Sequence, residues 1–161
     1  MPVELRAFQS LDLQHLNDWA CTIAIDDFMS RSRPKPTAVT SHDLSKGILW
    51  FVIVESGLDA GTIWLEPGEQ PNESILGIFL NDRSRFGLGI GSLAIRLALS
   101  ELWNLYPSQT VTLNVRQANF RAIACYKKIG FSISSSGSKI SPSGNSIPYF
   151  QMQLQSSISN A

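Results

Sequence analysis

The chain has 161 residues and balances 13 Lys+Arg against 13 Asp+Glu, so its formal net charge is zero. This length fits one domain with a core of its own. The balanced charge argues against a nucleic-acid binder that works by broad phosphate neutralisation, and it gives no polybasic signal for membranes. Residues 1–8 lack the apolar core of a signal peptide, and no apolar run is long enough to cross a membrane. We therefore expect a soluble cytoplasmic protein with one domain over residues 1–155 and a disordered tail over residues 156–161.

The chain begins with a strand pattern that is followed by short helical segments. Residues 3–8 alternate in the manner of a strand, and Ser10 and Asp12 offer capping oxygens for a helix that follows. A second helical stretch over residues 26–29 ends before Pro34, because proline is incompatible with a continuing helix.

Three strands are predicted next. Residues 47–55 are β-branched and aromatic and form the clearest strand of the sequence. Residues 56–59 are interpreted as a hairpin connection to a returning strand over residues 61–65. A polar loop over residues 67–72 then leads to a third strand over residues 74–80.

The pattern then changes to helices that alternate with strands. A helix over residues 90–106 is stopped by Pro107, a strand over residues 109–115 alternates apolar and polar residues, and a helix over residues 119–129 ends at Gly130. Such a crossover after a group of strands favours a mixed sheet with helices packed on it.

The last part is predicted as a strand over residues 131–135, a Ser/Gly-rich loop over residues 134–144 and a strand over residues 147–154. The two cysteines, Cys21 and Cys125, have no metal-ligand spacing, so we expect buried small residues. No pair of histidines has metal-ligand spacing either, and we expect no metal.

Three glycines, Gly87, Gly89 and Gly91, stand where a strand passes into a helix. Glycine allows a tight turn and a close approach of an anion to main-chain N–H groups, and a helix N-terminus adds unpaired donors there. A Walker loop would need a lysine before Ser92, and the dinucleotide fingerprint would need a third glycine at that position. A phosphate-containing ligand and a simple turn both remain open for this loop alone.

A second group of residues follows downstream. Asn119, Ala122 and Tyr126 are spaced so that an amide, a small gap and a phenol share one face of the helix. Taken alone, Asn119 fits a plain helix cap and Tyr126 a core tyrosine. Their spacing after a glycine loop favours a joint role.

Here the sequence resembles the Gcn5-related N-acetyltransferase (GNAT) family. The glycine loop is similar to the family's acetyl-coenzyme A signature Q/R-x-x-G-x-G/A, with Phe86 at the Q/R position as a departure, and the segment from Asn119 to Gly130 resembles the second hallmark. Residues 5–8 and residues 77–82 are similar to a subgroup that acts on ribosomal-protein N-termini and polyamines. The resemblance implies an α/β fold: a mixed, mostly antiparallel sheet of about seven strands with splayed central strands and helices on both faces.

The resemblance also implies an acetyltransferase that moves an acetyl group from acetyl-CoA to a primary amine of a small molecule or a protein N-terminus by direct attack. Tyr126 is then the general acid toward the leaving thiolate. The implied coenzyme contacts are Phe79, Leu80, Asn81, Phe86, Gly87, Leu88, Gly89, Ile90, Gly91, Ser92, Asn119, Ala122 and Tyr126.

The general base has no clear position. Some family members carry a glutamate at the position of Asn114 and others at that of Ile75; Glu73 would share a strand face with Ile75 and is a candidate base, with a solvated edge charge as the alternative. Asp26 and Asp27 are candidates for attracting a cationic substrate, with an exposed helix face as the alternative.

Two other functions stay open. Phe86 and Asn114 also suit a non-catalytic acyl-CoA-binding regulatory module of the same fold, and the glycine loop alone also suits a protein that binds ATP or NAD. We expect no nucleic-acid or membrane partner. The oligomeric state is open, with a homodimer as one alternative, and so is the length of the acyl chain.

Overall fold

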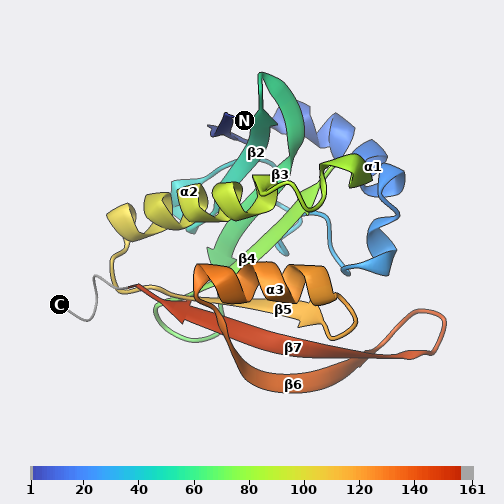
Figure 1. Cartoon of the computed structure of the whole chain (residues 1–161). Coiled ribbons are helices and arrows are strands. Elements are labelled where there is room, and N and C mark those ends of the chain that lie inside the picture. The colour runs from blue at the N-terminus through green and yellow to red at the C-terminus, as the bar shows by residue number, and fades with distance from the viewer. Residues whose placement is uncertain (1, 157–161) are drawn as a thin grey trace.

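The computed structural model describes residues 2–156, whose strands form one mixed sheet in the order β1-β2-β3-β4-β5-β7-β6 (Figure 1). The strands are β1 (Val3–Ala7), β2 (Leu49–Glu55), β3 (Leu58–Pro67), β4 (Glu73–Leu80), β5 (Thr110–Arg116), β6 (Ser132–Ile140) and β7 (Ser146–Gln155). The helices are α1 (Leu13–Thr22), α2 (Ile90–Leu105) and α3 (Phe120–Ile129), with short 3-10 turns η1 (Ser10–Asp12), η2 (Ile25–Asp27), η3 (Leu44–Lys46) and η4 (Arg83–Arg85). The expected fold is confirmed.

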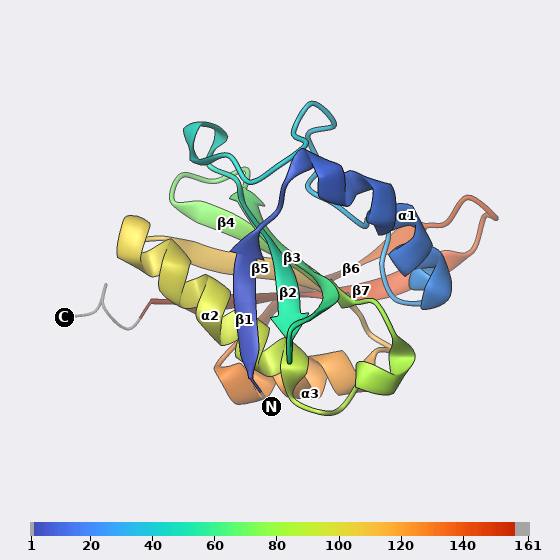
Figure 2. The same cartoon turned by 90° about the horizontal axis from the view of Figure 1, so that it is seen from above.

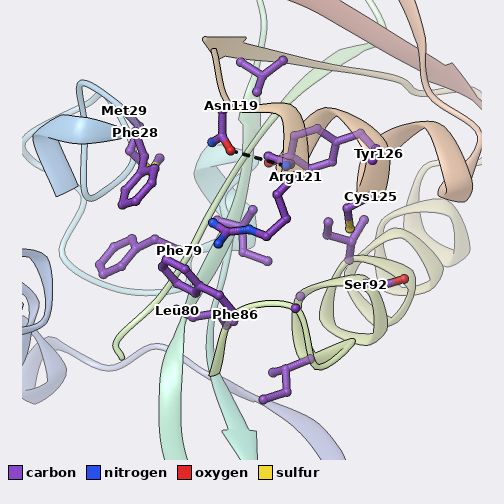
Figure 3. A pocket seen from close by; sticks show the side chains of 18 of the residues that line it. Phe28, Met29, Phe79, Leu80, Phe86, Ser92, Asn119, Arg121, Cys125 and Tyr126 are labelled. Atoms are coloured by element: carbon purple, nitrogen blue, oxygen red, sulfur yellow. Dashed lines mark hydrogen bonds between the residues drawn. The ribbon is translucent and has the colours of Figure 1, made fainter. Parts of the chain in front are cut away.

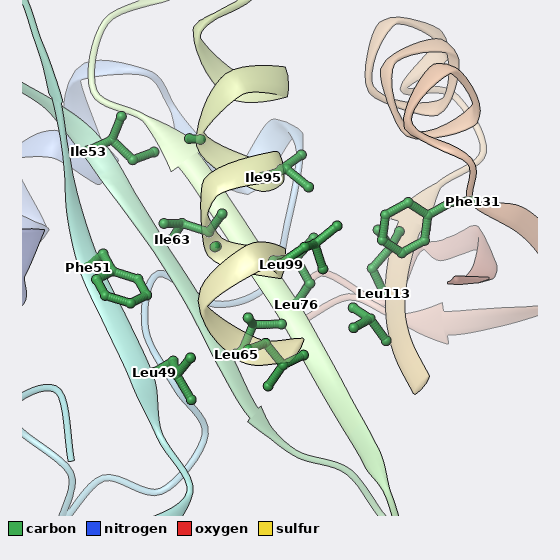
Figure 4. Close-up of a cluster of buried hydrophobic side chains, with 14 of the residues drawn as sticks. Leu49, Phe51, Ile53, Ile63, Leu65, Leu76, Ile95, Leu99, Leu113 and Phe131 are labelled. Carbon is green, nitrogen blue, oxygen red and sulfur yellow. The ribbon is translucent and has the colours of Figure 1, made fainter. Parts of the chain in front are cut away.

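Side-chain alternation along the strands divides the interior into two layers. On β3, Ile63 and Leu65 face a core that they share with α2 and α3, whereas Trp64 faces a second core that includes Leu16 of α1. Figures 1 and 2 show α1 on one side of the sheet and α2 and α3 on the other. Figure 4 shows the larger core, where α2 packs on β2, β3 and β4.

The sheet opens in its middle. All neighbouring strands are antiparallel except β4 and β5, which pair in parallel only from Glu73↔Thr110 to Ile75↔Thr112. From Leu76 onward β4 has β3 on one side and, among the residues that the structure describes, no strand on the other. The two halves of the sheet therefore part, as expected for splayed central strands.

Glycine and asparagine set the ends of the two helices beside this opening. Gly89, with φ of 87°, precedes α2, and the Asn119 Oδ1 accepts a hydrogen bond from Ala122 N at 3.4 Å and caps α3. Gly130, with φ of 124°, ends α3. These three residues fix where the helices begin and end relative to β4 and β5.

Four expectations need correction or comment. The Ser/Gly-rich loop predicted over residues 134–144 is wrong, because β6 continues to Ile140 and only residues 141–145 turn. The hairpin predicted over residues 56–59 is shorter, since β3 begins at Leu58. Cys21 is exposed and not buried. Of the tail predicted over residues 156–161, Ser156 is buried and the rest lies outside the described residues.

Candidate active site

A pocket of about 550 Å³ lies where β4 and β5 part. Its walls come from the second half of β4, the end of β5, the start of α2, one face of α3 and the segment that follows α1. Because α1 and the two other helices lie on opposite sides of the sheet, the pocket passes through the sheet from one face to the other (Figure 3).

The glycine loop forms the wall on the α2 side. Gly87 and Gly89 have φ of 75° and 87°, a conformation that a residue with a Cβ adopts only with strain, and no atom lies within 4 Å of an added Cβ at either position. The first N–H groups of α2, at Ile90, Gly91 and Ser92, precede the first intrahelical bond, which Leu93 N donates to Gly89 O at 3.1 Å. Open space in front of unpaired N–H groups at a helix start suits an anion.

The exposed edge of β4 offers a second set of backbone groups. Asn81 N donates to Ala60 O at 2.8 Å across the β3–β4 ladder. Backbone groups alternate in direction along an antiparallel strand, so those of Ile78 and Leu80 point away from β3, toward the opening. Unpaired backbone groups in a pocket are available to a ligand.

An aromatic and cationic cluster stands at the mouth. The Phe28 and Phe86 rings meet edge to face, with centroids 5.7 Å apart. The Arg121 guanidinium carbon lies 4.1 Å from the centroid of the Phe86 ring, and Figure 3 shows its side chain reaching from α3 toward Phe86. Arg121 thus places a positive charge next to the residue that replaces the usual Gln or Arg of the loop signature.

Tyr126 lies on α3 with its ring against Phe131, at a centroid distance of 5.9 Å. Burial, with a smaller contribution from Cys125, raises the pKa of the Tyr126 phenol above its usual value near 10. The phenol therefore stays protonated at neutral pH and is available as a proton donor. Burial also raises the pKa of the Cys125 thiol, which favours its neutral form over the reactive thiolate.

Most of the predicted coenzyme contacts come together in this pocket. The ones that line it are Phe79, Leu80, Phe86, Gly87, Gly89, Ile90, Gly91, Ser92, Asn119, Ala122 and Tyr126. Leu88 and Asn81 do not line it: Leu88 is exposed at the outside of the loop, and the Asn81 side chain donates to Asp59 O at 2.8 Å, toward the β2–β3 hairpin.

The three candidate carboxylates do not line the pocket. Glu73 lies at the start of β4, where Thr112 Oγ1 donates to its Oε2 at 3.4 Å and its Oε1 accepts from Gln70 N. Asp26 and Asp27 are exposed in η2 near the α1-side entrance, and the Asp27 carboxylate is bound by Arg83 at 2.9 Å.

Sequence reasoning missed the α1-side wall. Ile23, Phe28 and Met29 line the pocket, although they lie about sixty residues before the glycine loop. The loop that carries them is held in place because Arg83 Nε donates to Ile23 O at 2.9 Å. The only sequence signal was that these three residues are apolar and lie close to the short turn η2. Asn114, noted for its missing carboxylate, also lines the pocket.

The part of the chain from residue 2 to residue 156 contains no cluster of three or more His, Cys, Asp or Glu residues that could hold a metal ion. Within the same residues, no helix has both the length and the apolar character needed to cross a membrane.

A family model described as the acetyltransferase (GNAT) domain matches residues 3–132. No curated protein matches the chain significantly. Several solved structures share the fold. A GNAT-family acetyltransferase from Streptococcus pneumoniae aligns with a TM-score of 0.75 at 18% identity, over 96% of this chain and 99% of that one.

Two further structures match over almost their whole length. The aminoglycoside acetyltransferase AAC(6')-Ib, solved in complex with coenzyme A, aligns with a TM-score of 0.73 at 20% identity, over 99% of this chain and 98% of its own. A spermidine N-acetyltransferase chimera from Vibrio cholerae and hSSAT aligns with a TM-score of 0.75 at 17% identity, over all of both chains. At these identities the likeness shows the fold.

Proposed function

Since the chain belongs to the GNAT family of acetyltransferases, whose domain model covers most of its length, we propose that it transfers the acetyl group of acetyl-CoA to a primary amine. The observation that carries this proposal is the pocket through the sheet. Such a passage lets a thioester enter from the α2 and α3 side and an amine from the α1 side. The two reactants then meet between β4 and β5.

The coenzyme is proposed to bind on the α2 side. Its pyrophosphate would accept hydrogen bonds from the N–H groups at the start of α2, which is supported by the open space in front of Gly87 and Gly89. Arg121 and Lys128, which also line the pocket, add positive charge for the phosphates. The free backbone groups of Ile78 and Leu80 would hold the pantetheine arm and polarise the acetyl carbonyl.

The reaction is proposed to be a direct attack. The amine nitrogen forms a bond to the thioester carbonyl carbon, the C–S bond breaks, and the leaving thiolate takes a proton from the Tyr126 hydroxyl. What supports the role is the place of the phenol on α3 in the lining of the pocket, where it is protonated at neutral pH. The amine loses its proton to solvent, and Tyr126 regains one there.

Release of free thiol from acetyl-CoA in the presence of amines tests the proposal. Tyr126→Phe removes only the hydroxyl, so we expect kcat to fall by about 10²-fold or more while the affinity for acetyl-CoA stays the same. Unchanged kcat on a verified amine would remove Tyr126 from the acid role. Stronger thermal stabilisation by ATP or NAD than by acetyl-CoA would contradict the choice of coenzyme.

A non-catalytic module that binds acyl-CoA is the second candidate, because Phe86 replaces the usual polar residue of the loop and Asn114 offers no carboxylate. Tight acetyl-CoA binding without thiol release from any amine would favour this module. We further propose that the protein acts in the cytoplasm, the compartment where acetyl-CoA is available to such an enzyme. A homodimer remains a proposal that sedimentation would test.

A further inference from the structure

The α1 side of the pocket, which we call the acceptor end, differs in character from the coenzyme side. Its side chains are those of Ile23, Phe28, Met29, Phe79 and Asn114. Four of them are apolar, and the fifth is a neutral amide. The backbone of Gly77 completes this wall, with the buried Trp64 indole directly against it.

Charge in the pocket is of one sign. Within residues 2–156 no Asp or Glu side chain lines it, whereas Arg85, Arg121 and Lys128 do. Arg85 is paired with Glu55 at 3.6 Å. For Arg121 and Lys128, no carboxylate of the described residues lies within ion-pair distance. A second positive charge on a bound amine would therefore find no carboxylate in the lining.

Two acids of η2, Asp26 and Asp27, do not line the pocket. Asp27 is bound to Arg83, whose guanidinium carbon lies 4.9 Å from the centroid of the Phe28 ring. Arg116 donates to the carbonyl oxygen of Asp26 and so brings another cation to the same turn. The Asp27 carboxylate is thus paired with an arginine, whereas at Asp26 the arginine contact is to the backbone carbonyl oxygen.

We propose, on the basis of the acetyl transfer proposed above, that the acceptor is a monoamine whose nitrogen is carried by an apolar aryl or alkyl group. The apolar wall stabilises such a group by removing it from water. A polyamine or an aminoglycoside would have to bury further ammonium groups without a counter-charge, which is unfavourable. The same apolar surroundings lower the pKa of the reacting ammonium and so favour its neutral, nucleophilic form, in a site whose lining supplies no carboxylate base.

Four amines test the inference at saturating acetyl-CoA. We expect kcat/KM for 2-phenylethylamine and hexylamine to exceed that for spermidine and kanamycin by about tenfold or more. An equal or higher kcat/KM for spermidine or kanamycin would overturn the inference and leave acetyl transfer standing. Absence of thiol release with all four amines would overturn the inference, and thiol release with another primary amine would then show that acetyl transfer itself stands.

A pair of variants isolates the role of charge. Met29→Glu introduces a carboxylate into the acceptor end, whereas Met29→Gln introduces a neutral side chain of the same length. The ratio of kcat/KM for spermidine to that for 2-phenylethylamine should rise about tenfold in Met29→Glu relative to Met29→Gln. An equal ratio in both variants would refute the argument from charge, and thermal stabilisation by acetyl-CoA shows that each variant is folded.

Discussion

Gly77 is the position where the packing of the pocket wall makes the sharpest prediction. It lies on β4 opposite Trp64 of β3, and a Cβ at this position would stand 2.1 Å from Cζ2 and 2.2 Å from Cε2 of the indole. The indole cannot move aside freely, because Trp64 is buried and its Nε1 donates to the Glu66 Oε2 at 2.8 Å. We therefore expect Gly77→Ala to be destabilising.

The expected loss in the free energy of unfolding follows from three contributions. Overpacking a well-filled site costs about 2 kcal/mol. Displacing the indole from Glu66 weakens a buried hydrogen bond to a charged acceptor, at about 2 kcal/mol. Replacing a flexible glycine in a strand returns about 1 kcal/mol. The net loss of about 3 kcal/mol corresponds to a fall in Tm of about 6–12 °C for a domain of this length.

Thermal unfolding of Gly77→Ala beside Gly91→Ala is the measurement. At Gly91 an added Cβ would only touch Ile78 Cδ1 at 3.9 Å, and the residue lies in the first turn of α2 without a positive φ. Gly91→Ala should therefore leave Tm unchanged or raise it slightly.

Trp64→Leu should partly rescue Gly77→Ala, with a coupling of about 2 kcal/mol between the two sites. The steric reasoning is refuted if Gly77→Ala lowers Tm no more than Gly91→Ala. It is also refuted if the losses in the free energy of unfolding of Gly77→Ala and Trp64→Leu simply add in the double variant.

Three more predictions concern coenzyme binding, the ion pair between Glu66 and Arg31, and the pH dependence of stability. Arg121→Ala should raise KM for acetyl-CoA about tenfold with little change in kcat, and Arg121→Lys should recover part of the loss; an unchanged KM would remove Arg121 from coenzyme binding. Glu66→Gln should lower the free energy of unfolding by about 2 kcal/mol in urea unfolding, because the buried carboxylate binds Arg31 at 3.0 Å; a loss below about 0.5 kcal/mol would show that this ion pair contributes little. Burial lowers the pKa of His42, whose Nδ1 accepts from Trp50 N at 2.9 Å. As pH falls below about 6.5, the unfolded chain binds a proton that the folded state resists, so stability falls. His42→Asn keeps an acceptor without titrating, so Tm should depend less on pH between about 5 and 7; an unchanged pH dependence would exclude His42 as its source.

Local features of the sequence predicted the parts of the site that depend on backbone conformation. Gly87 and Gly89 act through their own positive φ angles, and Asn119 acts by capping the helix that follows it. Each role therefore depends on only a few neighbouring residues. The same holds for the strands and helices with clear periodicity. The strand–helix–strand order predicted a mixed sheet, and the resemblance to a known family supplied its splayed central strands.

The remaining features depend on contacts between distant segments. Phe28 meets Phe86 only because the loop after α1 folds across the opening, and nothing near either residue indicates the partner. The second half of strand β6, predicted as a loop, was missed for another reason. Its serines and Gly137 have weak strand preference, and it is held as an edge strand by pairing with β7 and not by burial.

The brief parallel pairing of β4 with β5 also affects how the molecule resists opening. Within residues 2–156, strand pairing joins one half of the sheet to the other only over the register from Glu73↔Thr110 to Ile75↔Thr112. A ligand in the pocket bridges the two halves beyond that point, so its binding free energy adds to the resistance against their separation. We expect amide hydrogen exchange along the far halves of β4 and β5 to slow on ligand binding more than exchange at the outer strands β1 and β6. Ligand binding and the resistance of the sheet to opening thus both depend on the gap between β4 and β5.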